Sequence, residues 1–69
     1  MNPPWKVFPE LARGSIGWRM GAGEDCYNQF YKWFSALDAN DQDRYREANA
    51  EPAGWEGFYE TIVEHPWRD

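Results

Sequence analysis

The sequence predicts a mainly α-helical fold, in which three helices form one small domain behind an extended N-terminal segment over residues 1–23 that has room for one short β-hairpin. Two segments place large apolar residues at helical spacing, a third carries helix-capping residues, and proline or glycine interrupts the chain elsewhere. The chain has 69 residues, and domains are seldom shorter than about 50. We therefore expect residues 1–69 to form a single domain.

The clearest helix is predicted over residues 24–38. Gly23 is acceptable as its N-cap, and Glu24 and Asp25 suit the positive end of the helix dipole. At about 100° per residue, the large and apolar side chains gather on one face. These are Cys26, Tyr27, Phe30, Trp33, Phe34 and Leu37.

Two shorter helices are expected over residues 41–48 and 55–64. Asn40 or Asp41 can cap the first of them, which has little apolar surface and must be stabilised by packing. The second contains Gly57, at a cost of about 1 kcal/mol relative to alanine, and ends before Pro66. Its apolar face would be formed by Trp55, Phe58, Tyr59, Ile62 and Val63.

The first 23 residues contain two patterns that are typical of extended chain. Pro3 and Pro4 fix the backbone in a polyproline-like conformation. Residues 15–20 alternate small or polar side chains with large apolar ones, which predicts a short strand with Ile16, Trp18 and Met20 on one side. The four glycines between positions 14 and 23 indicate that the backbone there turns or approaches another segment closely.

The composition limits both stability and partners. Five Trp, four Tyr and four Phe residues are more rings than so small a domain can cover, so some ring faces should remain exposed. The net charge of −5, spread along the chain, argues against direct binding to nucleic acid or to anionic membranes. We see no apolar run of about 20 residues and no signal peptide. The single cysteine excludes an internal disulfide and favours a cytoplasmic location.

Few residues offer catalytic or metal chemistry. Gly21-Ala22-Gly23 lacks the remaining parts of a phosphate-binding motif, and acidic residues follow it. Cys26 and His65 are the only soft metal ligands, whereas a structural zinc site needs four ligands. We expect Cys26 to be a buried apolar residue and His65 to lie at a helix end. The sequence therefore predicts no enzyme activity, no cofactor and no metal.

Trp18, Arg19 and Met20 are the candidate binding residues for a protein partner. They lie between two glycines, and Trp and Arg are the residue types that most often dominate the energy of interfaces. A purely structural interpretation also fits, in which Trp18 packs in the core, Met20 fills a gap and Arg19 pairs with a carboxylate. The sequence leaves both interpretations open.

Glu56, Glu60 and Glu64 recur every four residues and would form an acidic strip on one helix face. Such a strip is either a solvated surface or a contact for a basic partner.

These features predict a small interaction module that binds a protein or peptide, or a second copy of itself, through exposed aromatic residues. The alternative is an acidic inhibitor or regulator of a basic or nucleic-acid-binding protein.

Overall fold

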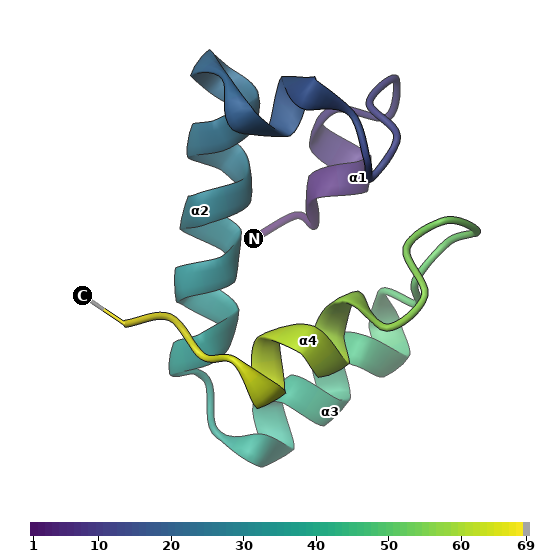
Figure 1. Ribbon diagram of the computed structural model, residues 1–69. Coiled ribbons are helices and arrows are strands. Elements are labelled where there is room, and N and C mark those ends of the chain that lie inside the picture. The colour runs from purple at the N-terminus through teal and green to yellow at the C-terminus, as the bar shows by residue number, and fades with distance from the viewer. Residues whose placement is uncertain (69) are drawn as a thin grey trace. The chain divides into compact units, whose positions relative to one another are not determined.

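The computed structural model describes residues 1–68, and it is mainly helical, as the sequence predicts (Figure 1). In chain order the elements are α1 (Pro4–Val7), the 3₁₀-helix η1 (Ile16–Arg19), α2 (Gly21–Ala36), α3 (Ala39–Ala48) and α4 (Phe58–Glu64). The chain divides into two compact units, residues 1–30 and residues 31–69. We call them the N-terminal and C-terminal units. Helix α2 contributes its first part to one and its last part to the other.

Short helices occupy the N-terminal unit in place of the predicted extended segment and hairpin, and no strand occurs within residues 1–68. Pro3 is the N-cap of α1 and Pro4 is its first residue. That position suits proline because the first amides of a helix have no carbonyl partner within it. The two prolines therefore begin a helix instead of an extended segment. Both are buried.

Residues 16–19 form a 3₁₀-helix where the alternating pattern predicted a strand. Ser15 is its N-cap, and the Ser15 Oγ accepts a hydrogen bond from the Gly17 amide at 3.1 Å. A 3₁₀-helix has three residues per turn, so the side chains no longer alternate between two faces. Trp18 points into the core, while Ile16 and Met20 are exposed.

Helix α2 begins at Gly21, three residues before the predicted start. Gly21 has a positive φ of 53°, a conformation that glycine adopts without strain and that turns the chain from η1 into α2. The close approach between backbone segments that the glycines predicted is confirmed. Gly23, in the first turn of α2, lies directly against the backbone of Gly17 in η1. Gly23 is thus a packing residue rather than the N-cap.

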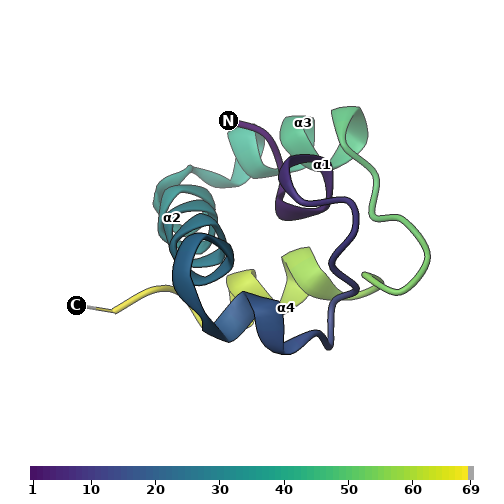
Figure 2. The same ribbon diagram turned by 90° about the horizontal axis from the view of Figure 1, so that it is seen from above.

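An aromatic cluster forms the core of the C-terminal unit. Phe34 of α2 stacks on Tyr59 of α4 with 5.0 Å between ring centroids, and Tyr45 of α3 contacts both rings edge-on, at 5.9 and 6.0 Å. Figure 2 looks along α2 and shows α3 and α4 as separate segments. The contact between the Tyr45 and Tyr59 rings joins these two helices. Ile62 and Phe58 are fully buried in the same unit.

Helix α3 begins at Ala39, close to the predicted start, but its cap is Asp38 rather than Asn40 or Asp41. The Asp38 Oδ1 accepts a hydrogen bond from the Asp41 amide at 2.8 Å. Asp38 itself is extended, so α2 ends at Ala36 rather than at residue 38.

Helix α4 begins at Phe58 rather than at residue 55. Gly57 has a φ of 83°, in the left-handed region, so a right-handed helix cannot continue through it. The residues before it form tight turns, in which the Trp55 amide bonds to the Pro52 carbonyl and the Phe58 amide to the Trp55 carbonyl. Gly57 therefore sets the start of α4. Because it lies outside the helix, it does not destabilise the helix as an internal glycine would.

Candidate functional site: the surface of η1

Trp18, the centre of the sequence-predicted site, is part of the core of the N-terminal unit. Its side chain is only 6% exposed, and its indole Nε1 donates a hydrogen bond to the Ala12 carbonyl at 2.8 Å. The ring meets Phe8 edge-on at 6.1 Å and Tyr27 at 6.0 Å. Trp18 is therefore a core residue, which is the structural one of the two interpretations. A ring with these contacts has little surface left for a partner.

The burial of Trp18 leaves its neighbours exposed. Ile16 is 71% exposed and Met20 is 61% exposed, which is high for large apolar side chains, and Arg19 is exposed beside them. Ile16 and Arg19 are three residues apart, a spacing that places side chains on the same side of a 3₁₀-helix. We call Ile16, Arg19 and Met20 the η1 surface.

The sequence pattern identified Arg19 and Met20 but not Ile16 as candidate contact residues. The alternation that predicted a strand grouped Ile16 with Trp18, whereas the 3₁₀-helix groups it with Arg19. The Ser15-x-Gly17 turn is the local signal for this change, because serine caps favour helical turns over strands.

Arg19 does not form the ion pair with a carboxylate that the structural interpretation predicted. Its guanidinium makes no ion pair with any carboxylate of residues 1–68. An exposed cation between two exposed apolar side chains can contact a partner that offers an apolar group and a carboxylate together.

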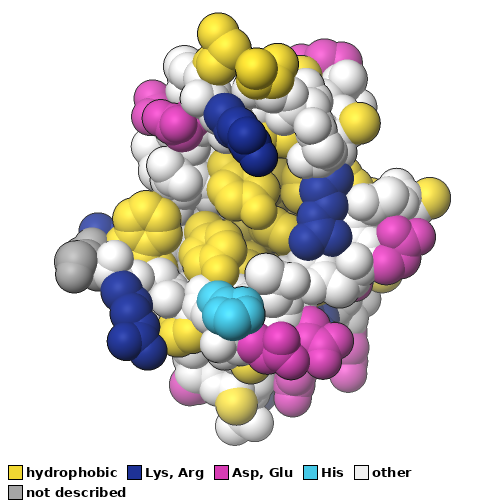
Figure 3. Space-filling view, in the orientation of Figure 1, with side chains coloured by type: hydrophobic (Ala, Val, Ile, Leu, Met, Phe, Trp, Pro, Cys, Tyr) yellow, Lys and Arg dark blue, Asp and Glu magenta, His cyan; other side chains and the backbone are white. Residues whose placement is uncertain are grey.

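The charge is divided unevenly between the two units rather than spread along the chain. Residues 1–30 contain three basic and three acidic side chains, whereas residues 31–69 contain four basic and nine acidic ones. On the face that Figure 3 shows, the acidic side chains form several separate groups, with lysine and arginine between them. The η1 surface thus belongs to an electrically balanced unit, and the net charge of −5 arises in the other.

The predicted acidic strip is shorter than expected. Glu56 precedes α4, and its carboxylate turns back to accept a hydrogen bond from the Gly54 amide at 2.8 Å. Glu60 and Glu64 are both exposed on α4, and Val63 beside them is 47% exposed although it was expected on the apolar face. We call Glu60, Val63 and Glu64 the α4 surface.

Glu51 is an important residue that the sequence pattern did not identify. Its carboxylate accepts hydrogen bonds from the Gly57 amide at 3.2 Å and the Tyr59 amide at 2.8 Å, two amides at the N-terminal end of α4. The Tyr59 hydroxyl donates to the Asn49 carbonyl at 2.6 Å, so the loop is held at both ends. The one available signal was an acidic residue ahead of a helix that lacks a capping side chain at Gly57.

Cys26 and His65 lie in different units. Cys26 is half-buried rather than buried as expected, and this partial burial raises the pKa of its thiol, which disfavours the reactive thiolate. Cys26 lines a hollow of about 270 Å³ in the N-terminal unit together with Met1, Val7 and Phe30. His65 is the exposed C-cap of α4, as its place in the sequence predicts. Across residues 1–68, no three His, Cys, Asp or Glu side chains are gathered as a metal site would need.

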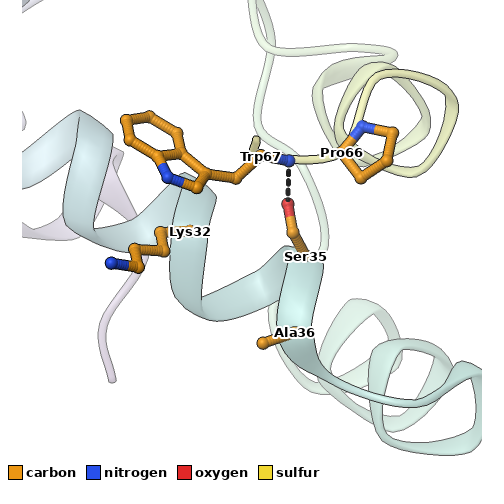
Figure 4. A pocket seen from close by; sticks show the side chains of 5 residues that line it. All are labelled: Lys32, Ser35, Ala36, Pro66 and Trp67. Atoms are coloured by element: carbon orange, nitrogen blue, oxygen red, sulfur yellow. Dashed lines mark hydrogen bonds between the residues drawn. The ribbon is translucent and has the colours of Figure 1, made fainter. Parts of the chain in front are cut away.

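A second hollow lies where the C-terminal tail folds back on α2 (Figure 4). The Trp67 amide donates to the Ser35 Oγ at 3.0 Å, and the Tyr31 hydroxyl donates to the His65 carbonyl. The Trp67 indole and the Lys32 side chain line this hollow of about 240 Å³. Ser35 also donates to the Tyr31 carbonyl at 2.8 Å, so its hydroxyl is occupied by contacts within the chain.

Within the described part of the chain, no helix has both the length and the apolar character needed to cross a membrane. Comparisons of the chain with protein-family models, with curated proteins and with solved structures give no match, so its function has to be inferred from its own residues.

Proposed function

We propose that this chain is a small protein-interaction module that binds a protein or peptide partner through the η1 surface. The observation that carries the proposal is the exposure of Ile16 and Met20, at 71% and 61%, which flank in sequence an exposed Arg19 that makes no ion pair within residues 1–68. Single exposed apolar side chains are common on soluble proteins, whereas grouped ones are typical of contact surfaces. Trp18 acts in this proposal as the buried anchor of η1 rather than as a contact residue.

The anchoring of η1 supports the proposal energetically. The Ser15 cap, the Trp18 indole hydrogen bond and the two ring contacts of Trp18 fix the segment before any partner arrives. A contact segment that is already ordered loses less conformational entropy on binding. The η1 surface should therefore behave as a preformed contact rather than as a loop that folds on binding.

We propose that the chain is a binding protein and not an enzyme. Its lone thiol has a raised pKa, and its lone histidine is an exposed helix cap. We also place the module in the cytoplasm, since unpaired cysteines are typical of reducing compartments. Its partner would be a protein or peptide, because the balanced N-terminal unit lacks the clustered cations that nucleic acid requires.

The acidic regulator remains a second candidate function, and the distribution of charge favours it. The C-terminal unit holds nine acidic side chains against four basic ones, and Glu60 and Glu64 on α4 are exposed. Such a surface would bind a basic protein with a strong dependence on salt, because exposed charges more than about 8 Å apart are screened at physiological ionic strength. Binding through the η1 surface would lose the ionic part of Arg19 in high salt but would keep the apolar contact of Ile16 and Met20.

An affinity capture from lysate of the source cell separates the two functions. The baits are the native chain, the double variant Ile16→Ser/Met20→Ser, and Val7→Ser as a matched control, because Val7 is also exposed at 45% but lies outside η1. A specific protein that the native and Val7→Ser baits retain in high salt, and that the double variant loses, supports the η1 module. Retention by all three baits that disappears in high salt supports the acidic regulator and contradicts the η1 proposal.

A further inference from the structure

The η1 surface and the α4 surface have complementary chemistry. The first presents a cation, Arg19, beside the apolar Ile16 and Met20, and the second presents Glu60 and Glu64 beside Val63. On an α-helix, residues three and four apart are neighbours, so Glu60, Val63 and Glu64 form one contiguous group. Each surface therefore offers what the other lacks, an apolar contact adjoining a charge of opposite sign.

The charges of both surfaces are available for an intermolecular contact. Neither Arg19, Glu60 nor Glu64 makes an ion pair within residues 1–68, and all three side chains are exposed. Glu56, by contrast, is engaged with the Gly54 amide and stands outside α4. The availability of Glu60 and Glu64 thus sets them apart from the third member of the predicted strip.

We propose that the partner of the η1 surface is the α4 surface of a second copy of this chain. The inference rests on the proposed function and adds the identity of the partner. Arg19 of one copy would pair with Glu60 and Glu64 of the next, while Ile16 and Met20 pack on Val63. The two surfaces differ, so a copy that binds through its η1 surface still has its α4 surface, which either the same partner or a further copy would occupy.

This arrangement has a measurable consequence. The average mass should rise with concentration above that of the single chain, to a dimer if two copies exchange both contacts and further if each copy binds a new one. The contact involves few residues, so the association should be weak, and its ionic part should decline as salt is added.

Charge reversal tests the proposal by sedimentation equilibrium over a range of protein concentrations at low salt. Arg19→Glu and the double variant Glu60→Lys/Glu64→Lys should each weaken self-association about tenfold, which corresponds to about 1.4 kcal/mol. The double variant lowers the size of the net charge from −5 to −1, since each Glu→Lys change adds two positive charges. If general repulsion controlled association, this variant would associate more strongly than the native chain, which would contradict the proposal.

Two further samples complete the test. The triple variant, which combines both reversals, should regain self-association because the two surfaces are again complementary. Asp43→Lys/Glu47→Lys is the matched control, because these exposed acidic residues are also four apart on a helix and no ion pair holds them within residues 1–68. It should associate at least as strongly as the native chain, since it changes the net charge equally and spares both surfaces.

The outcomes separate this inference from the proposed function. A native chain that stays monomeric at millimolar concentration overturns the self-association, and so does equal weakening by the α3 control. Neither result affects an η1-dependent capture of another protein. Loss of association in Arg19→Glu alone would also overturn the α4 contact, because it would indicate that η1 meets a different surface.

Discussion

A Cβ atom placed on Gly23 would stand 2.0 Å from the backbone carbonyl oxygen of Gly17. The first turn of α2 therefore rests directly on the backbone of η1, and only a residue without a side chain fits between them. Real Cβ atoms do not approach a carbonyl oxygen so closely, and the backbone of Gly17 has no flexible end that could move aside. This contact links the position of the η1 surface to the packing of α2.

Gly23→Ala should destabilise the protein. Alanine is favoured over glycine inside a helix by about 1 kcal/mol, but overpacking commonly costs about 1–3 kcal/mol and more against rigid backbone. We expect the clash to outweigh the gain in helix propensity, so that the free energy of unfolding measured in urea falls by on the order of 2 kcal/mol. Gly14→Ala is the control, since a Cβ there meets nothing within 4 Å. Equal stability of Gly23→Ala and the native chain would show that the contact is not as close as described.

Glu51→Gln should weaken the beginning of α4. The substitution removes the negative charge that accepts hydrogen bonds from the Gly57 and Tyr59 amides, and such caps contribute about 1 kcal/mol. We expect a loss of about that size, together with faster hydrogen exchange of the Tyr59 amide. Glu47→Gln, on the exposed side of α3, should change neither quantity. Unchanged exchange at Tyr59 would remove Glu51 from the cap.

The C-terminal unit should lose stability in alkaline solution. Burial raises the pKa of Tyr45 to about 12, and burial together with Tyr45 and Glu51 raises the pKa of Tyr59, from ordinary values of about 10. A raised pKa in the folded state means that this stability is fully present below about pH 10. It is lost as the pH rises toward 12, because ionisation then favours the unfolded chain.

Tyrosine absorbance and circular dichroism between pH 9 and 12.5, on the native chain and on Tyr45→Phe, check this pH dependence. The variant removes one of the two titrating groups, so it should lose less stability over that interval than the native chain. Identical pH profiles for the two proteins would contradict the role of Tyr45.

Ser35→Ala should loosen the contact between Trp67 and α2, while the Tyr31 hydroxyl still holds the His65 carbonyl. The Ser35 Oγ accepts the hydrogen bond from the Trp67 amide, and alanine cannot replace it. Trp67 is 37% exposed, and the bond lies at the surface, so the cost to global stability should be below about 1 kcal/mol. The readouts are faster exchange of the Trp67 amide and unchanged exchange at Tyr59. Equal protection of Trp67 in both proteins would contradict the contact.

Helical periodicity predicted the existence of α2 and α4, because amphipathic patterns depend on many residues at once, and capping residues predicted α3. Their ends were less predictable, since single contacts decide them. Gly57 ends the predicted 55–64 helix early through its left-handed backbone, and Asp38 rather than Asn40 caps α3. Composition alone could not show that Gly57 is left-handed or that Glu51 reaches forward to α4.

The candidate site was predicted only in part. Arg19 and Met20 are exposed in the segment that the sequence identified, but Trp18 is buried and Ile16 takes its place. A six-residue alternation cannot distinguish a strand from a 3₁₀-turn, and the choice between them decides which side chains share a face. The Ser15 cap and the close packing of Gly17 on Gly23 make that choice, and the second is a contact between segments.

The most direct test of the η1 surface uses the two methionines of the chain. Met1 and Met20 are both 61% exposed, so the methyl signals of a methionine-labelled protein report two surfaces of equal accessibility by NMR. When the concentration of the chain is raised, or cell lysate is added, we predict that the Met20 methyl signal shifts or broadens while that of Met1 remains sharp. Binding that perturbs Met1 alone, or that leaves Met20 unchanged, would show that η1 is not the contact surface.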